Sequence, residues 1–182
     1  MAFHHLALAT NDMDATHRFY TEAMGFELVK AVVAPTPSGK GWAKHVFYDT
    51  GGDGMIAFWD LHDDRVGTED CSISSGMGLP GWVNHIAFEA SLDQLAPFTE
   101  RWLRTGRDVV EVDHGFCRSI YTEDPNGNTV EWCADVRAFT DEDRAEAAAA
   151  LADPNPPFET PPMPTFHLAA DYAAAHGQPV GS

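Results

Sequence analysis

The feature that most constrains the fold of this chain is an internal repeat. Residues 3–8 (FHHLAL) and residues 83–88 (VNHIAF) share one pattern: apolar, polar, His, apolar, Ala, apolar. Each copy is followed by a helix start and then by short runs rich in Val, Ile, Phe, Tyr and Trp, broken by turn residues. Repeats of this kind are supersecondary units that bury their apolar faces together. The sequence therefore predicts two copies of a strand, a helix and then two or three strands.

Helix caps occur at matching places in the two copies. Asn11 or Asp12 can cap the first helix, and Ser91 with Gln94 forms a capping box at the start of the second. These boundaries divide the chain into four parts: a first module at residues 1–61, a connector at 62–82, a second module at 83–135 and a tail at 136–182.

The tail differs in composition from the modules. It begins with an Ala-rich segment that has acidic residues in its first turn, which is typical of a helix, and a proline-rich stretch at 154–164 should be extended. We expect an arm that packs on the body or on a partner subunit; a disordered end is the alternative.

Charge and cysteine content limit the partners and the compartment. The formal net charge of −17 repels phosphate backbones and anionic lipid, so we expect neither nucleic acid nor a membrane as a partner. We find no apolar run of membrane-spanning length and no secretory signal. Three cysteines without a paired motif fit free thiols, which favours the cytoplasm.

Strand alternation places the repeated histidines on one face. His5 and Ala7 share one side of their strand, while Leu6 and Leu8 face the other; His85 and Ala87 repeat this arrangement. The bulky apolar side should pack on the helices. The opposite side of each strand carries an imidazole beside a small alanine. The small alanine leaves room there for a metal and its ligand.

A carboxylate comes from the last hairpin of the second copy. If its turn centres on Asn126, Tyr121 and Glu131 lie opposite each other on one face. Glu131 stands in an otherwise apolar strand, where a buried carboxylate needs a strong partner. The sequence predicts one divalent metal bound by His5, His85 and Glu131, a set suited to Fe(II), Mn(II) or Zn(II).

Other assignments remain open at this point. His4 could replace His5 as a ligand, although it would not match the position of His85. Cys133 shares the face of Glu131 and could bind a soft metal, or it could be a small buried residue. Glu131 could also point outward, and the histidines could be ordinary hydrogen-bonded residues.

These residues resemble the vicinal oxygen chelate superfamily of glyoxalases, extradiol dioxygenases, fosfomycin-modifying enzymes and bleomycin-binding proteins. The resemblance rests on the apolar-x-His strand, on Asp12 through Phe19-Tyr20 to Gly25-Phe26, and on residues 124–131 (DPNGNTVE). It implies an α+β fold of two βαβββ modules whose strands form a partly closed, barrel-like sheet around the metal. Because members are often dimers, it also implies a homodimer.

Individual positions help to choose among the members. Glyoxalase-type sites resemble four-ligand sets, with a carboxylate late in the first module as well as in the second. Matching residues 54–59 to 127–132 puts Phe58 at the place of Glu131, and phenylalanine cannot bind a metal. Only a shifted register would bring Asp60 to that place. Fosfomycin-modifying enzymes usually have a hydroxyl-bearing residue where Ala7 stands, and bleomycin-type binders lack the metal set. Extradiol dioxygenases have a tyrosine at the place of Tyr121 and a histidine shortly before it, for which His114 is the candidate, although most have twice as many modules.

The leading hypothesis is therefore a non-haem Fe(II) dioxygenase that acts on a small aromatic diol or an enediol. Tyr121 would hydrogen-bond a substrate oxygen, and His114 would serve as acid or base. His45 and Arg118 are weaker candidates for supporting roles. The alternatives are a metal-dependent lyase, isomerase, epimerase or thiol transferase, with Mn(II), Zn(II) or Ni(II), and a non-catalytic small-molecule-binding resistance protein.

Overall fold

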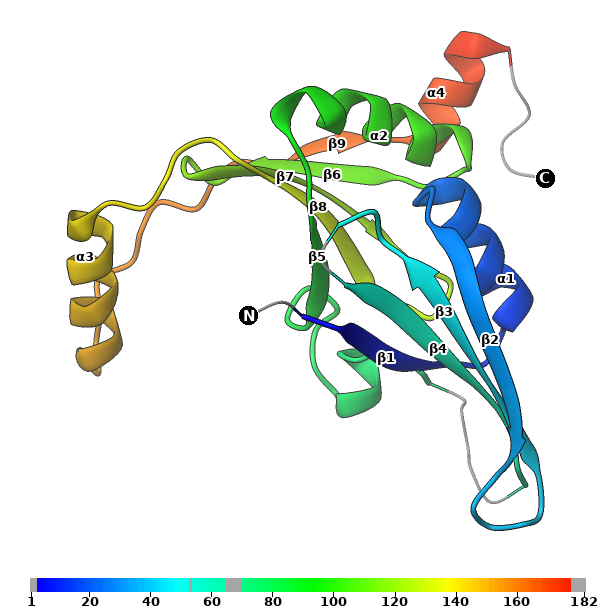
Figure 1. Ribbon diagram of the computed structural model, residues 1–182. Helices are drawn as coiled ribbons and strands as arrows, with labels where there is room; N and C mark the ends of the chain where they lie inside the picture. The colour runs from blue at the N-terminus through cyan, green and yellow to red at the C-terminus, as the bar shows by residue number, and fades with distance from the viewer. Residues whose placement is uncertain (1–2, 53, 65–69, 178–182) are drawn as a thin grey trace.

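The first module forms a four-stranded sheet (Figure 1). The computed structural model describes residues 3–52, 54–64 and 70–177. The sheet has the order β1-β4-β3-β2, with β1 parallel to β4 and the other neighbours antiparallel. Its elements are β1 (His5–Thr10), α1 (Met13–Arg18) with a π-helical turn (Phe19–Ala23), β2 (Glu27–Pro35), β3 (Trp42–Asp49) and β4 (Met55–His62).

The second module repeats this order in a second sheet. The strands run β5-β8-β7-β6-β9, with β5 parallel to β8. Its elements are β5 (His85–Glu89), α2 (Leu92–Arg104), β6 (Val109–Asp113), β7 (Cys117–Glu123) and β8 (Thr129–Asp135), and the tail contributes β9 (Thr165–His167). The α+β fold of two βαβββ modules is confirmed. Within the described residues, their strands form two separate open sheets.

The predicted caps start both module helices. The Asp12 carboxylate accepts the Ala15 N–H at 2.9 Å, so Asp12 rather than Asn11 is the cap of α1. Ser91 and Gln94 form the capping box of α2. Gly25 ends the first helical segment with φ +80°, a backbone conformation that side chains with a Cβ rarely adopt.

The two modules pack together through their helix-facing sides. The ring of Phe26 lies 5.0 Å from that of Phe88 and 5.8 Å from that of Trp132, measured between centroids. Leu6 and Leu8 pack against this shared core, as their alternation predicts. The opposite face of each sheet, which carries His5 in one module and His85 in the other, is left open to solvent or to a partner.

The turn at residues 124–128 is a polar link between the modules. Asp124 is 1% exposed and accepts the backbone N–H groups of Asn126 and Asn128 and the hydroxyl of Tyr20, the last at 3.0 Å. Asn126 also accepts the Thr10 hydroxyl at 2.7 Å. Buried polar groups need such partners, so this motif has a structural role at the junction of the two modules.

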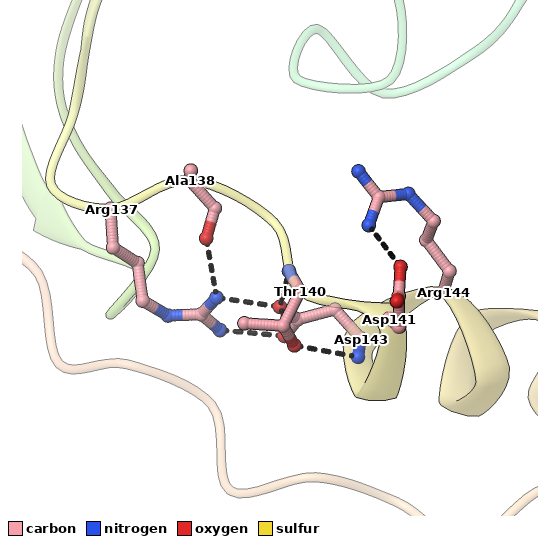
Figure 2. A network of polar contacts seen from close by, with 6 residues as sticks. All are labelled: Arg137, Ala138, Thr140, Asp141, Asp143 and Arg144. Carbon is pink, nitrogen blue, oxygen red and sulfur yellow. Dashed lines mark hydrogen bonds and ion pairs between the residues drawn. The ribbon is translucent and has the colours of Figure 1, made fainter.

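The tail forms an arm that leaves the body and returns to it. Figure 1 shows α3 (Asp141–Ala152) away from both sheets, and none of its residues is buried among the residues described. The capping box of Thr140 and Asp143, together with two 2.7 Å bonds from Arg137 to Asp143, fixes the start of α3 (Figure 2).

The chain then comes back to the second module. It adds β9 to the edge of β6, and α4 (Ala169–His176) packs on α2. The sequence pattern predicts the helix at α3 but neither β9 nor α4. The connector contains a short 3-10 turn (Ser75–Met77). No helix in the described ranges combines the length and the apolarity needed to cross a membrane.

Candidate metal centre

The structure brings two of the three predicted metal ligands together. Because β5 and β8 are parallel neighbours, Ala87 pairs with Glu131, and His85, two residues before Ala87, lies on the same face. The Nε2 atom of His85 is 3.1 Å from Oε2 of Glu131. Glu131 is only 5% exposed, and the His85 side chain is 39% exposed. A nearly buried carboxylate next to an accessible imidazole is a donor set that fits a divalent metal.

Tyr121 and His114 lie beside this pair. Tyr121 is the direct cross-strand partner of Glu131, as the position of the turn predicts. Its hydroxyl is 3.0 Å from Nε2 of His114, and its ring centroid is 6.2 Å from that of His85. Burial and, to a smaller extent, the charge of Glu131 raise the pKa of Tyr121 well above its usual value. The hydroxyl is therefore protonated at neutral pH.

His5 is on the other sheet and does not join the pair within one chain. Its Nδ1 lies 2.7 Å from Nδ1 of His4, and its ring faces Phe47 at 5.5 Å between centroids. No three His, Cys, Asp or Glu side chains among residues 3–52, 54–64 and 70–177 are arranged to hold a metal. Each chain thus presents two separate parts of the predicted ligand set.

A cleft lies between the two modules. It has a volume of about 1020 Å³ and is lined by Leu6 and Met55 from the first module and by His85, Phe98 and Arg101 from the second, whereas His5 is not among its lining residues. In the described sheets β1 pairs with β4 and β5 pairs with β8, so each has a second edge without a strand partner there.

Aromatic side chains surround His5. The His45 ring stacks on Trp59 at 3.8 Å and 12° and lies 4.1 Å from Phe47 and 6.2 Å from His5, all between centroids. Burial, and then the charge of His5, lower the pKa of His45. From the sequence we predict His45 only as a supporting residue, and neither Phe47 nor Trp59 is predicted at the site. Alternation along β3 and β4 is the signal that would have put them on the face of His5.

Phe58 does not occupy the place of Glu131, so that expectation is wrong. Ala7 pairs with Ala57 as Ala87 pairs with Glu131, which makes Ala57 the equivalent position. Both hairpin turns hold the same number of residues between their last paired positions, so Gly54 corresponds to Asn128 and not to Gly127. The first module still offers no carboxylate at this position.

Asp60 and Arg118 point away from the predicted centre. Asp60 shares the face of the buried Phe58, where it pairs with His62 at 2.9 Å and Lys44 at 3.5 Å. Arg118 alternates with Ser119 and Tyr121, so it lies on the other side of β7 and bonds Asp113 at 3.4 Å.

Comparisons with known proteins agree with this architecture. Residues 2–132 match the family model described as Glyoxalase/Bleomycin resistance protein/Dioxygenase superfamily. No curated protein matches the chain significantly.

Similar solved structures share the fold at low sequence identity. A glyoxylase/bleomycin resistance protein/dioxygenase domain from Frankia sp. EAN1pec has a TM-score of 0.59, 19% identity, and coverage of 74% of this chain and 98% of that one. The fosfomycin resistance protein FosX from Listeria monocytogenes has a TM-score of 0.53, 21% identity, and coverage of 79% and 98%. The oxidase ChaP-H2 has a TM-score of 0.50, 19% identity, and coverage of 76% and 95%. The family match spans most of the two modules, and the chain belongs to the Glyoxalase/Bleomycin resistance protein/Dioxygenase superfamily.

Proposed function

We propose that this protein is a non-haem Fe(II) dioxygenase of the extradiol type, acting on a small aromatic diol or a related enediol. His85 and Glu131 of one copy and His5 of a second copy would hold the metal. The observation that carries the proposal is the Tyr121–His114 pair, whose 3.0 Å contact lies directly beside the carboxylate of Glu131.

A homodimer would complete the ligand set. Among the described residues His5 forms no metal-binding group with His85 and Glu131, and the two histidines are exposed on their sheets. In the sheets of the described residues, β1 and β5 each have one edge without a strand partner, and such edges favour pairing with another chain. A two-fold dimer uses the same contacts twice, so it would build two such centres.

The side chains around the half-site have distinct tasks. A bound Fe(II) would supply positions for both substrate oxygens and for O2, and a path for electron density between them. The protonated hydroxyl of Tyr121 donates a hydrogen bond to a substrate oxygen. His114, in contact with that hydroxyl, takes up or returns the proton that the substrate releases on binding.

Metal analysis and oxygen consumption test the proposal. Protein purified without oxygen should contain one iron per chain, which is two per dimer. It should consume O2 when a catechol is added. Zinc, nickel or manganese without O2 uptake would instead support a lyase, isomerase, epimerase or thiol transferase. Absence of metal, with an intact fold in His5→Ala, would support a non-catalytic binding protein.

A further inference from the structure

The aromatic group next to His5 is more than core packing. Phe47, His45 and Trp59 are on the open face of the first sheet rather than on the side that packs against Phe26 and Phe88. Trp59 is 38% exposed, although burial of a tryptophan is favourable. On this face β1 carries His5, Ala7 and Ala9, so apart from the His5 ring only short side chains lie beside these rings from that strand.

A buried nitrogen in this group lacks a partner. Nε2 of His45 is shielded from solvent and makes no hydrogen bond within the described part of the chain. Unpaired buried polar atoms are costly and uncommon, and they often mark a site where a ligand completes the bonding. Trp59 stacks on one face of the His45 ring and so fixes its orientation. The same ring also lies next to Phe47 and His5.

We propose that Phe47 and His45, the latter positioned by Trp59, form the surface against which an aromatic ring of the substrate packs. The inference rests on the proposed function, since it takes His5 as a metal ligand: a substrate whose oxygens bind the metal at His5 places the rest of its body within reach of these rings. A planar ring packs on this surface in edge-to-face or offset geometry. The aromatic diols are thereby favoured over aliphatic enediols.

Two chelating probes separate ring recognition from metal binding. 4-Nitrocatechol carries a ring and acetohydroxamate does not, and both bind iron through two oxygens. Each is titrated under argon into the iron-loaded full chain, with its affinity followed by absorbance. We expect Phe47→Leu and Trp59→Leu to weaken 4-nitrocatechol roughly three- to tenfold while acetohydroxamate affinity changes less than about twofold. Phe47→Tyr, which retains a ring, should weaken 4-nitrocatechol less than Phe47→Leu does.

Trp42→Leu is the matched control. Trp42 stacks on His62 with the same 3.8 Å and 12° geometry, and it alternates with Ala43 and His45 onto the other face of the same hairpin. It should alter neither affinity. Equal weakening of both probes in Phe47→Leu, or no weakening of either, overturns the inference and leaves the metal centre standing. A wild type that binds neither probe removes the proposed centre and the inference with it.

Discussion

Two variants, each lacking a different part of the ligand set, test whether the metal centre is shared between copies. His5→Ala removes the imidazole of the first module, and Glu131→Gln removes the carboxylate of the second while keeping its shape. Each variant alone should lose metal affinity by more than the 10- to 100-fold typical of changes beyond the direct ligands. Both should keep their fold, because His5 is exposed and Glu131 is replaced by a side chain of equal size.

The expected recovery follows from the separation of His5 from the His85–Glu131 pair. When the two variants are unfolded and refolded together, random assortment makes about half of the dimers mixed. In a mixed dimer, intact His5 from one copy meets intact Glu131 of the other at one site, and both changes fall in the second site. Metal content and turnover should therefore return to about one quarter of the wild-type values.

Elemental analysis and O2 uptake of the co-refolded sample measure this recovery. Each variant refolded alone is the background, and His4→Ala is the matched control, because it removes the neighbouring imidazole but should retain metal. A co-refolded sample no better than the separate variants would refute a shared centre. Loss of metal in His4→Ala equal to that in His5→Ala would refute the ligand assignment based on strand alternation.

Three further predictions concern single positions. Glu131→Gln should lose bound metal with little change in thermal unfolding, and unchanged metal content would place the carboxylate ligand elsewhere. Tyr20→Phe removes the buried bond to Asp124 and should lower the free energy of unfolding by about 1–2 kcal/mol in urea titrations, without changing metal content. Hydrogen bonds from the Arg137 guanidinium and, to a smaller extent, from the backbone N–H and hydroxyl of Thr140 hold the pKa of the Asp143 carboxyl well below its usual range. The ionised carboxylate should therefore stabilise the start of α3 fully above about pH 4, and this stabilisation should diminish as the pH falls from there toward the lowered pKa, seen as faster amide exchange at 140–145 that Asp143→Ala reproduces at neutral pH.

Local pattern was sufficient for much of the structure. The repeated apolar-x-His strand and the caps at Asp12 and Ser91 predict the order of elements in both modules. Alternation along single strands and one turn predict that Tyr121 faces Glu131. These features depend on residues close in the sequence and on the short side-chain period of strands and helices, so they can be predicted from the sequence alone.

Tertiary structure alone decided how the modules meet. The repeat places His5 and His85 at equivalent positions but contains no information on the distance between the two strands. That distance follows from the packing of Phe26 against Phe88 and Trp132. This packing joins the modules through their helix-facing sides and leaves both histidine-bearing faces open. Contacts between distant segments depend on the shape of the whole core, and a local pattern cannot report them.

The same distinction explains the remaining differences. Ala57 rather than Phe58 corresponds to Glu131, because hydrogen-bonded register follows the length of the turns and not the position of their glycines. A strand as short as β9 has no pattern of its own and exists because the edge of β6 is available to pair with it. The sequence by itself determined the modules and the faces of their strands, and only the packing between them decided which side chains of one chain can share a site.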